Sequence, residues 1–232
     1  MDHLKKTTMI TELPQDPFDT ACWSSGPFND ARRVFAEVFS HKEIKELRRE
    51  VRRIGSYAFS EKLYKKEAPC DVLLDMKVVR SALAAAHALR AASGAELAPA
   101  AEPVVVRLVD YCCGGGKPDA WGDFPRSLTI KEYHHPYGVF ATLFRRGSLQ
   151  RWVQDWEALV EAALTPGDAG LRLNVIPLCT GLTKLLEAAH LIWVREGGGG
   201  IKSTGGGGKG ASADGAPGAA AAGSAGKRKK GV

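Results

Sequence analysis

Apolar residues recur along the first third of the chain with the spacing of amphipathic helices. Residues 1–29 are rich in proline and turn-forming residues, and we expect an irregular segment there. A helical pattern starts at Asp30 and places four apolar side chains on one face: Val34, Phe35, Val38 and Phe39.

A second helix is predicted to begin directly after the first, because Ser40–Glu43 has the S-x-x-E form of a capping box. Its apolar positions have 3,4,3 spacing, and Gly55 stands where a left-handed C-terminal cap is expected. The opposite face is rich in basic residues, which favours either a solvated surface with i,i+4 ion pairs or a surface that contacts phosphates. The candidate nucleic-acid-binding residues on this face are Arg48, Arg49, Arg52 and Arg53.

A third helix is predicted from a cap at Asp71 to Gly94, and it is apolar on most sides. We expect it to be largely buried, with His87 as a packed structural histidine rather than a ligand. Residues 30–94 therefore form a predicted helical region. After a soft linker, residues 104–109 are rich in β-branched types and are bounded by proline and glycine, as in a buried strand.

The segment DYCCGGGK, residues 110–117, comes after that strand and has two possible explanations. Zinc sites usually separate their cysteines by two to four residues, whereas Cys112 and Cys113 are adjacent and would point to opposite faces of an extended chain. No metal is therefore expected. The alternative is a turn in which glycines let the backbone pass close to a nucleotide-like ligand.

The glycine turn gains support from the order of motifs between residue 104 and about residue 198, where the chain resembles class I S-adenosylmethionine-dependent methyltransferases. Their first motif, D-x-[GC]-C-G-x-G after a hydrophobic strand, fits residues 110–116. In that family the second strand ends in an acid and a third strand leads to another. Here SLTIKEYHH and RWVQDWEAL would be these strands, with Glu132 and Asp155 as the acids. LRLNVIPL would then be the fourth strand. The resemblance implies an α/β fold, in which the N-terminal helices precede a partial Rossmann-like parallel sheet over 104–196.

The resemblance also implies roles in binding S-adenosylmethionine. Gly114 and Gly116 would carry backbone under the methionine part, with Asp110 near its amino group. Glu132 would hold the ribose hydroxyls. Asp155 would accept from the adenine amine, and Trp156 would be available for stacking. The alternative for Glu132 and Asp155 is that both are solvated surface carboxylates.

The family's last strands would fall in a glycine-rich segment, so the expected domain is incomplete and its activity stays open. If active, its methyl acceptor would be RNA or protein. The competing hypothesis is a non-enzymatic helical adaptor that holds a nucleic acid or an acidic protein partner through its basic helix and tail. Cofactor binding would distinguish the two.

The net charge and the amino-acid composition add information mainly about the C-terminal residues 197–232. Residues 197–232 carry six lysines and arginines against one aspartate, and therefore hold +5 of the formal net charge of +6. We expect this glycine- and alanine-rich segment to be disordered, with KRKK at 227–230 as a nuclear import signal or a phosphate contact. We further expect no membrane span, a nuclear or cytoplasmic location and free thiols for the five cysteines.

Overall fold

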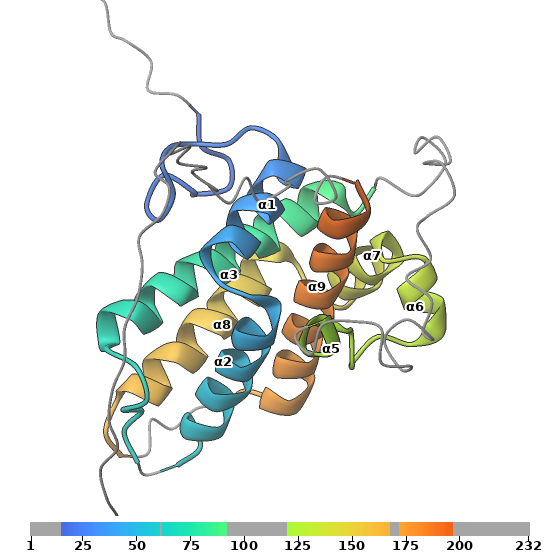
Figure 1. The fold of residues 1–232 in the computed structure, drawn as a ribbon. Coiled ribbons are helices and arrows are strands. Elements are labelled where there is room, and N and C mark those ends of the chain that lie inside the picture. The colour runs from blue at the N-terminus through green and yellow to red at the C-terminus, as the bar shows by residue number, and fades with distance from the viewer. Residues whose placement is uncertain (1–14, 61, 92–119, 168–171, 197–232) are drawn as a thin grey trace, which may run out of the picture. The chain divides into compact units, whose positions relative to one another are not determined.

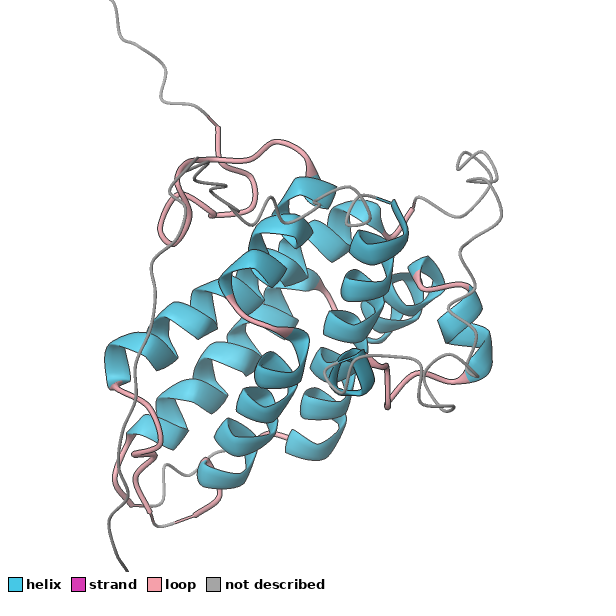
Figure 2. Cartoon of the chain, in the orientation of Figure 1, coloured by secondary structure: helices cyan, strands magenta, loops and turns pink. Residues whose placement is uncertain are grey.

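A computed structural model describes residues 15–60, 62–91, 120–167 and 172–196 (Figure 1). Within these ranges the regular structure is α-helical and contains no strand (Figure 2). In chain order the helices are α1 (Ala31–His41), α2 (Ile44–Tyr57), α3 (Pro69–Leu89), α5 (Ala120–Asp123), α6 (Ile130–His134), α7 (Tyr137–Arg146), α8 (Leu149–Leu164) and α9 (Val175–Glu196).

The predicted Rossmann-like sheet is wrong for the described part of the chain. Glu132 belongs to α6, where Thr129 Oγ1 accepts a hydrogen bond from Glu132 N at 3.2 Å and the Glu132 carboxylate accepts one from Thr129 N at 2.8 Å. This reciprocal capping box starts a helix at the place of the predicted second strand. The predicted third strand, which ends at Asp155, lies in α8, and the second half of the predicted fourth strand belongs to α9, which begins at Val175. The predicted first strand, 104–109, lies outside the described residues.

The helices predicted near the N-terminus are present, although three of their predicted end signals differ. Asp71 lies in the first turn of α3, whose N-cap residue is Ala68. Ser40 lies in the last turn of α1, so it does not cap α2, whose N-cap residue is Glu43. Gly55 lies inside α2 rather than at its end. A Cβ atom at Gly55 would lie 2.5 Å from Cys179 Sγ, so this glycine allows α2 and α9 to approach closely. Gly55 therefore serves the packing of α2 on α9 and does not form the predicted C-terminal cap of the helix.

Helix α9 is the central element of the described helices, and it contacts α1, α2, α3, α7 and α8 (Figure 1). Because it is surrounded, it is apolar around most of its circumference and buries ten of its residues. By length and composition alone α9 could also cross a membrane. The core helix of a folded domain passes the same test, and packing on several sides explains the composition of α9.

A buried ion pair joins α2 to α9. Arg48 Nη1 lies 2.8 Å from Glu187 Oε1, and the two side chains are 3% and 0% exposed. The same guanidinium donates to the carbonyl oxygens of Phe124, at 2.8 Å, and of Gly122. Glu187 in turn accepts from the backbone N–H groups of residues 126 and 127, at 2.9 and 2.8 Å. The pair therefore also fixes the segment 122–127 against both helices.

An aromatic cluster covers the contact between α1 and α9. The ring of His190 lies 4.9 Å from that of Phe39 and 5.5 Å from that of Trp193, measured between centroids. Burial, helped by the charge of Arg48, lowers the pKa of His190 to about 4. The imidazole is therefore neutral at neutral pH and packs as an aromatic residue.

Replacing Arg48 is expected to destabilise the fold strongly. Arg48→Met leaves Glu187 buried without its cation, which typically costs about 3–5 kcal/mol. Arg49→Met is the matched control, since Arg49 is an exposed residue of the same helix that pairs with Glu46 at 3.2 Å, and it should change stability by less than about 0.5 kcal/mol. Urea unfolding measures both, and equal losses in the two variants would contradict this account.

Stability should also depend on the protonation of His190. The unfolded chain binds a proton below about pH 6.5, which the native state resists until about pH 4. The stabilisation that neutral His190 contributes to the folded state is therefore complete above pH 6.5, and it is lost as the pH falls from 6.5 towards 4. Between pH 7 and pH 5 the wild type should lose up to about 2 kcal/mol more than His190→Phe. Urea midpoints at both pH values test this, and parallel losses would show that His190 does not resist protonation.

Candidate functional site

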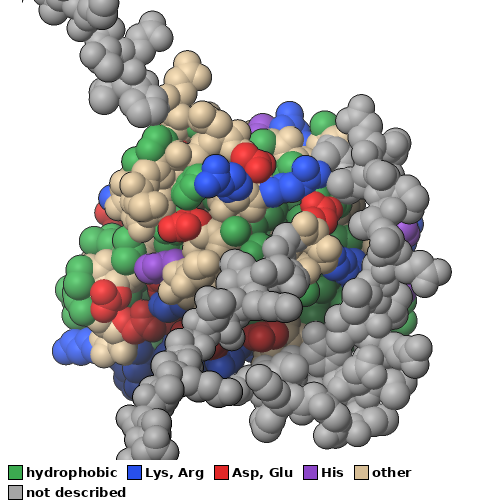
Figure 3. Space-filling model, turned by 45° about the horizontal axis from the view of Figure 1, so that its top comes forward, with side chains coloured by type: hydrophobic (Ala, Val, Ile, Leu, Met, Phe, Trp, Pro, Cys, Tyr) green, Lys and Arg blue, Asp and Glu red, His purple; other side chains and the backbone are tan. Residues whose placement is uncertain are grey.

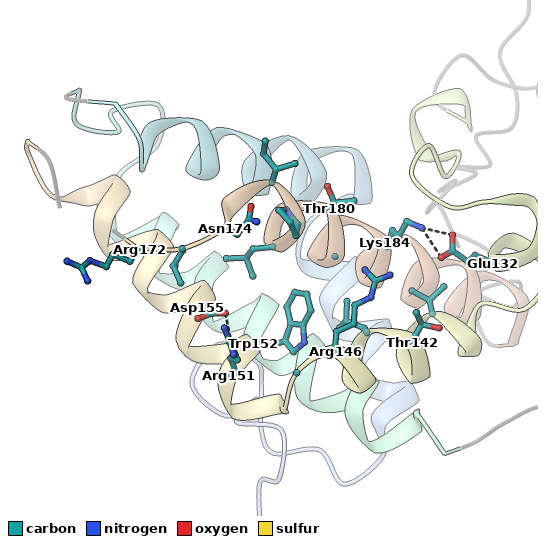
Figure 4. A pocket seen from close by; sticks show the side chains of 18 residues that line it. Glu132, Thr142, Arg146, Arg151, Trp152, Asp155, Arg172, Asn174, Thr180 and Lys184 are labelled. Atoms are coloured by element: carbon teal, nitrogen blue, oxygen red, sulfur yellow. Dashed lines mark hydrogen bonds and ion pairs between the residues drawn. The ribbon is translucent and has the colours of Figure 1, made fainter. Parts of the chain in front are cut away.

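A pocket of about 600 Å³ opens between α7, α8 and the first turns of α9, with Glu132 of α6 at one end (Figure 4). This volume is in the range of sites that bind small molecules or several side chains. Its interior is formed by apolar residues from the three helices and the segment before α9: Val139, Leu143, Trp152, Leu173, Pro177 and Leu178.

Trp152 lies along the wall of the pocket, and two local features position it. Ser148 caps α8 by accepting from Arg151 N at 3.2 Å, so Trp152 falls in the first turns of the helix. Across the pocket, Gly181 of α9 leaves room for the ring, since a Cβ atom there would lie 2.5 Å from Trp152 Cη2. The indole Nε1 is buried without a hydrogen-bond partner within the described residues.

Charged side chains surround this apolar interior. Four of them are basic, Arg146, Arg151, Arg172 and Lys184, and two are acidic, Glu132 and Asp155, which leaves an excess of two positive charges. Lys184 Nζ binds both carboxylate oxygens of Glu132 at 2.8 and 2.7 Å, and Arg151 lies 3.7 Å from Asp155 (Figure 4).

Arg146 and Arg172 differ from the other cations of the pocket. Both side chains are exposed, and neither has an ion pair or a hydrogen bond to the side chains of the described residues. The pocket therefore combines an apolar interior with two arginines whose charge is not compensated locally. This combination favours a ligand that carries both negative charge and apolar surface.

The pKa of Glu132 reflects its contacts with Lys184 and Thr129. Burial alone would raise this pKa, but the hydrogen bond from Lys184 and the contacts with Thr129 lower it below the usual value. The side chain is thus ionised at neutral pH and is a poor general base. Among the described residues that line the pocket there is no histidine or cysteine.

The structure brings together only some of the residues predicted to bind a cofactor. Glu132 and Asp155 line the same pocket, on α6 and α8. Trp156 does not reach it, because its ring is buried and its indole N–H donates to Met76 O at 3.1 Å. Asp110, Gly114 and Gly116 lie outside the described residues.

Of the four residues of α2 predicted to bind nucleic acid, only Arg48 is buried, and two of the others make local contacts on the helix. Arg48 is buried with Glu187, Arg49 pairs with Glu46, and Arg52 Nε donates to the carbonyl of Arg48 at 3.1 Å. Arg53 is partly exposed. On the uncovered part of the face shown in Figure 3, acidic and basic side chains are interspersed.

A second group of ionisable residues lies between α1, α2 and α3. Carboxylate oxygens of Glu50, Glu67 and Asp75 lie within 4.8 Å of one another, a spacing that a metal ion could use. Lys42 already supplies a cation, since its ammonium binds Asp75 and lies 3.3 Å from Glu67. Glu50 accepts from Tyr64 Oη. Burial raises the pKa of both Glu50 and Asp75, so the cluster favours proton retention.

Reasoning from the sequence missed the residues that make the pocket distinctive: Arg146, Trp152, Arg172, Gly181 and Lys184. One signal was available, because RRGS at 145–148 contains a helix-ending glycine and then a Ser cap. That pattern predicts that one helix ends and the next begins at residues 145–148, but it does not show which residues elsewhere in the chain pack against these two helix ends. Comparisons with known proteins add no assignment, since no protein-family model, curated protein or solved structure matches the chain.

Gly181→Ala should disturb the pocket through Trp152. The new Cβ atom would overlap the indole ring and lie 3.1 Å from Leu143 Cδ1, so the ring must shift. Such overpacking typically costs about 1–3 kcal/mol. Gly138→Ala in α7 is the control, because a Cβ atom there meets nothing within 4 Å, and this change should be neutral or slightly stabilising. Urea unfolding measures the difference, and similar stability of the two variants would exclude close packing of Trp152 on α9.

Proposed function

We propose that the described helices form a non-enzymatic binding module that holds an acidic segment of a partner protein in the pocket between α7, α8 and α9. The observation that carries this proposal is the pair of uncompensated arginines, Arg146 and Arg172, beside an apolar interior. Carboxylates in the partner would pair with these arginines, and an apolar side chain between them would enter the pocket.

The surface around the pocket favours a polypeptide over a small molecule. Ile176 lines the pocket but is 80% exposed, and Pro177 beside it is also exposed. A small ligand inside the pocket would leave this apolar surface in water, whereas a peptide segment crossing the opening would cover it. Trp and Arg are the residue types that contribute most strongly to such interfaces, and both are present in this pocket.

We favour this module over the methyltransferase hypothesis, which depends on a parallel sheet. That hypothesis places Glu132 and Asp155 at the ends of strands, but they lie on helices and are paired with Lys184 and Arg151. Nucleic-acid binding through α2 is also less favoured, because Arg48 is buried and its neighbours are partly engaged. Of the functions expected from the sequence, the acidic protein partner agrees best with the pocket.

Arg146→Gln should weaken binding of an acidic peptide. The probe is a fluorescein-labelled Asp-Glu-Phe-Leu-Glu-Asp, and its amide counterpart Asn-Gln-Phe-Leu-Gln-Asn reports binding without charge. Loss of one charge-assisted contact should raise the Kd of the full-length protein for the acidic peptide about 10-fold. Fluorescence anisotropy measures both peptides, and the preference for the acidic one should diminish as salt increases.

Arg145→Gln is the matched control, because Arg145 lies in the same last turn of α7 but does not line the pocket. Equal weakening by the two substitutions would indicate a general effect of charge rather than a site. Equal affinity for the two peptides would contradict the proposal. Tighter binding of single-stranded RNA, or a thermal shift with S-adenosylmethionine, would instead restore one of the hypotheses drawn from the sequence.

A further inference from the structure

Among the basic residues that line the pocket, Lys184 alone binds both oxygens of a carboxylate within the described residues. Its ammonium binds both oxygens of Glu132, and the two side chains are only 27% and 23% exposed. Figure 4 shows the pair at the end of the pocket where Arg146 also extends. A carboxylate is thus already present where an acidic ligand would find its strongest cationic surroundings.

The attachment of Glu132 is weak enough to be exchanged. Neither side chain is fully buried, so water still reaches both charges, and the ion pair contributes on the order of 1 kcal/mol. Glu132 belongs to α6, which has only five residues and no buried ones. Apart from Lys184, a hydrogen bond from Arg195 Nη1 to Tyr133 O, at 2.8 Å, and the stacking of the same guanidinium on the Tyr133 ring connect α6 to α9. These contacts with Arg195 do not involve Glu132, so α6 can stay attached when Glu132 leaves Lys184.

We propose that Glu132 is an internal competitor of the partner, which occupies on Lys184 the position that a partner carboxylate takes in the complex. This inference rests on the proposed function of the pocket. It makes Glu132 a specificity-determining residue, because only a ligand with a carboxylate of its own can replace that of Glu132 without leaving Lys184 unpaired. A neutral peptide would have to bind with Lys184 still occupied.

Competition and a merely structural role of Glu132 predict opposite effects. Glutamine is accepted at the third position of a capping box, so Glu132→Gln keeps the side-chain contact with Thr129 and removes only the charge. If Glu132 competes, the substitution frees Lys184, and the acidic peptide should bind about fivefold more tightly. If Glu132 only supports the pocket, binding should weaken or stay the same.

The test is a double-mutant cycle on the full-length protein with the acidic hexapeptide and its amide counterpart. Glu132→Gln should tighten binding of Asp-Glu-Phe-Leu-Glu-Asp in the wild-type background and have no effect in the Lys184→Gln background, because the competed cation is then absent. The affinity for the amide counterpart should not change. Thermal unfolding of each variant checks that α6 and the pocket remain folded.

The outcomes separate this inference from the function on which it rests. If the wild type prefers the acidic peptide but Glu132→Gln leaves its affinity unchanged or lowers it, the competition is refuted and the binding module stands. Tightening that persists in Lys184→Gln also refutes it, since the charge of Glu132 then acts elsewhere. If neither the wild type nor Glu132→Gln prefers the acidic peptide, the proposed function fails as well.

Discussion

The buried ion pair between Arg48 and Glu187 is the constraint on which the rest of the described structure depends. Removing two charges from water is costly, and the cost is offset here because the guanidinium and the carboxylate also bind backbone groups of residues 122–127. The pair therefore fixes the rotation of α9 about its axis as well as its distance from α2. With Glu187 directed at Arg48, Lys184 and Gly181 come to lie on the side of α9 that lines the pocket.

Glycine lets α9 pack closely on two sides. Gly55 admits Cys179 on one side, and Gly181 admits the indole of Trp152 on the other. Both contacts need a backbone position without a Cβ atom, so the two glycines serve close packing and not backbone flexibility. Between these contacts, the first turns of α9 form one wall of the pocket. The same close packing raises the pKa of the Cys179 thiol to about 11 by burial, which makes it a structural residue rather than a nucleophile.

The chemistry of the pocket depends on how its charges are paired. The two carboxylates are both taken up by neighbouring cations, whereas Arg146 and Arg172 are left without such partners among the described residues. Such a distribution suits recognition of an anion better than proton transfer, which requires a base with a pKa near neutrality. The acidic cluster around Lys42 has the opposite character, since its excess of carboxylates is already balanced in part by an internal cation, and burial raises the pKa of Asp75.

The sequence by itself determined the N-terminal helices, because the apolar periodicity around Val38 and Val51 has one structural solution. It also contained the capping box at Thr129–Glu132 and the helical spacing of Trp156, Leu159, Val160 and Ala163, although the family resemblance led to a strand at SLTIKEYHH and to another that ends at Asp155. What only the tertiary structure decided is which of these helical surfaces meet. The burial of Arg48, the purpose of Gly55 and Gly181, and the assembly of Arg146, Trp152 and Lys184 around one pocket depend on contacts between residues distant in sequence. Local propensity carries no information about such contacts.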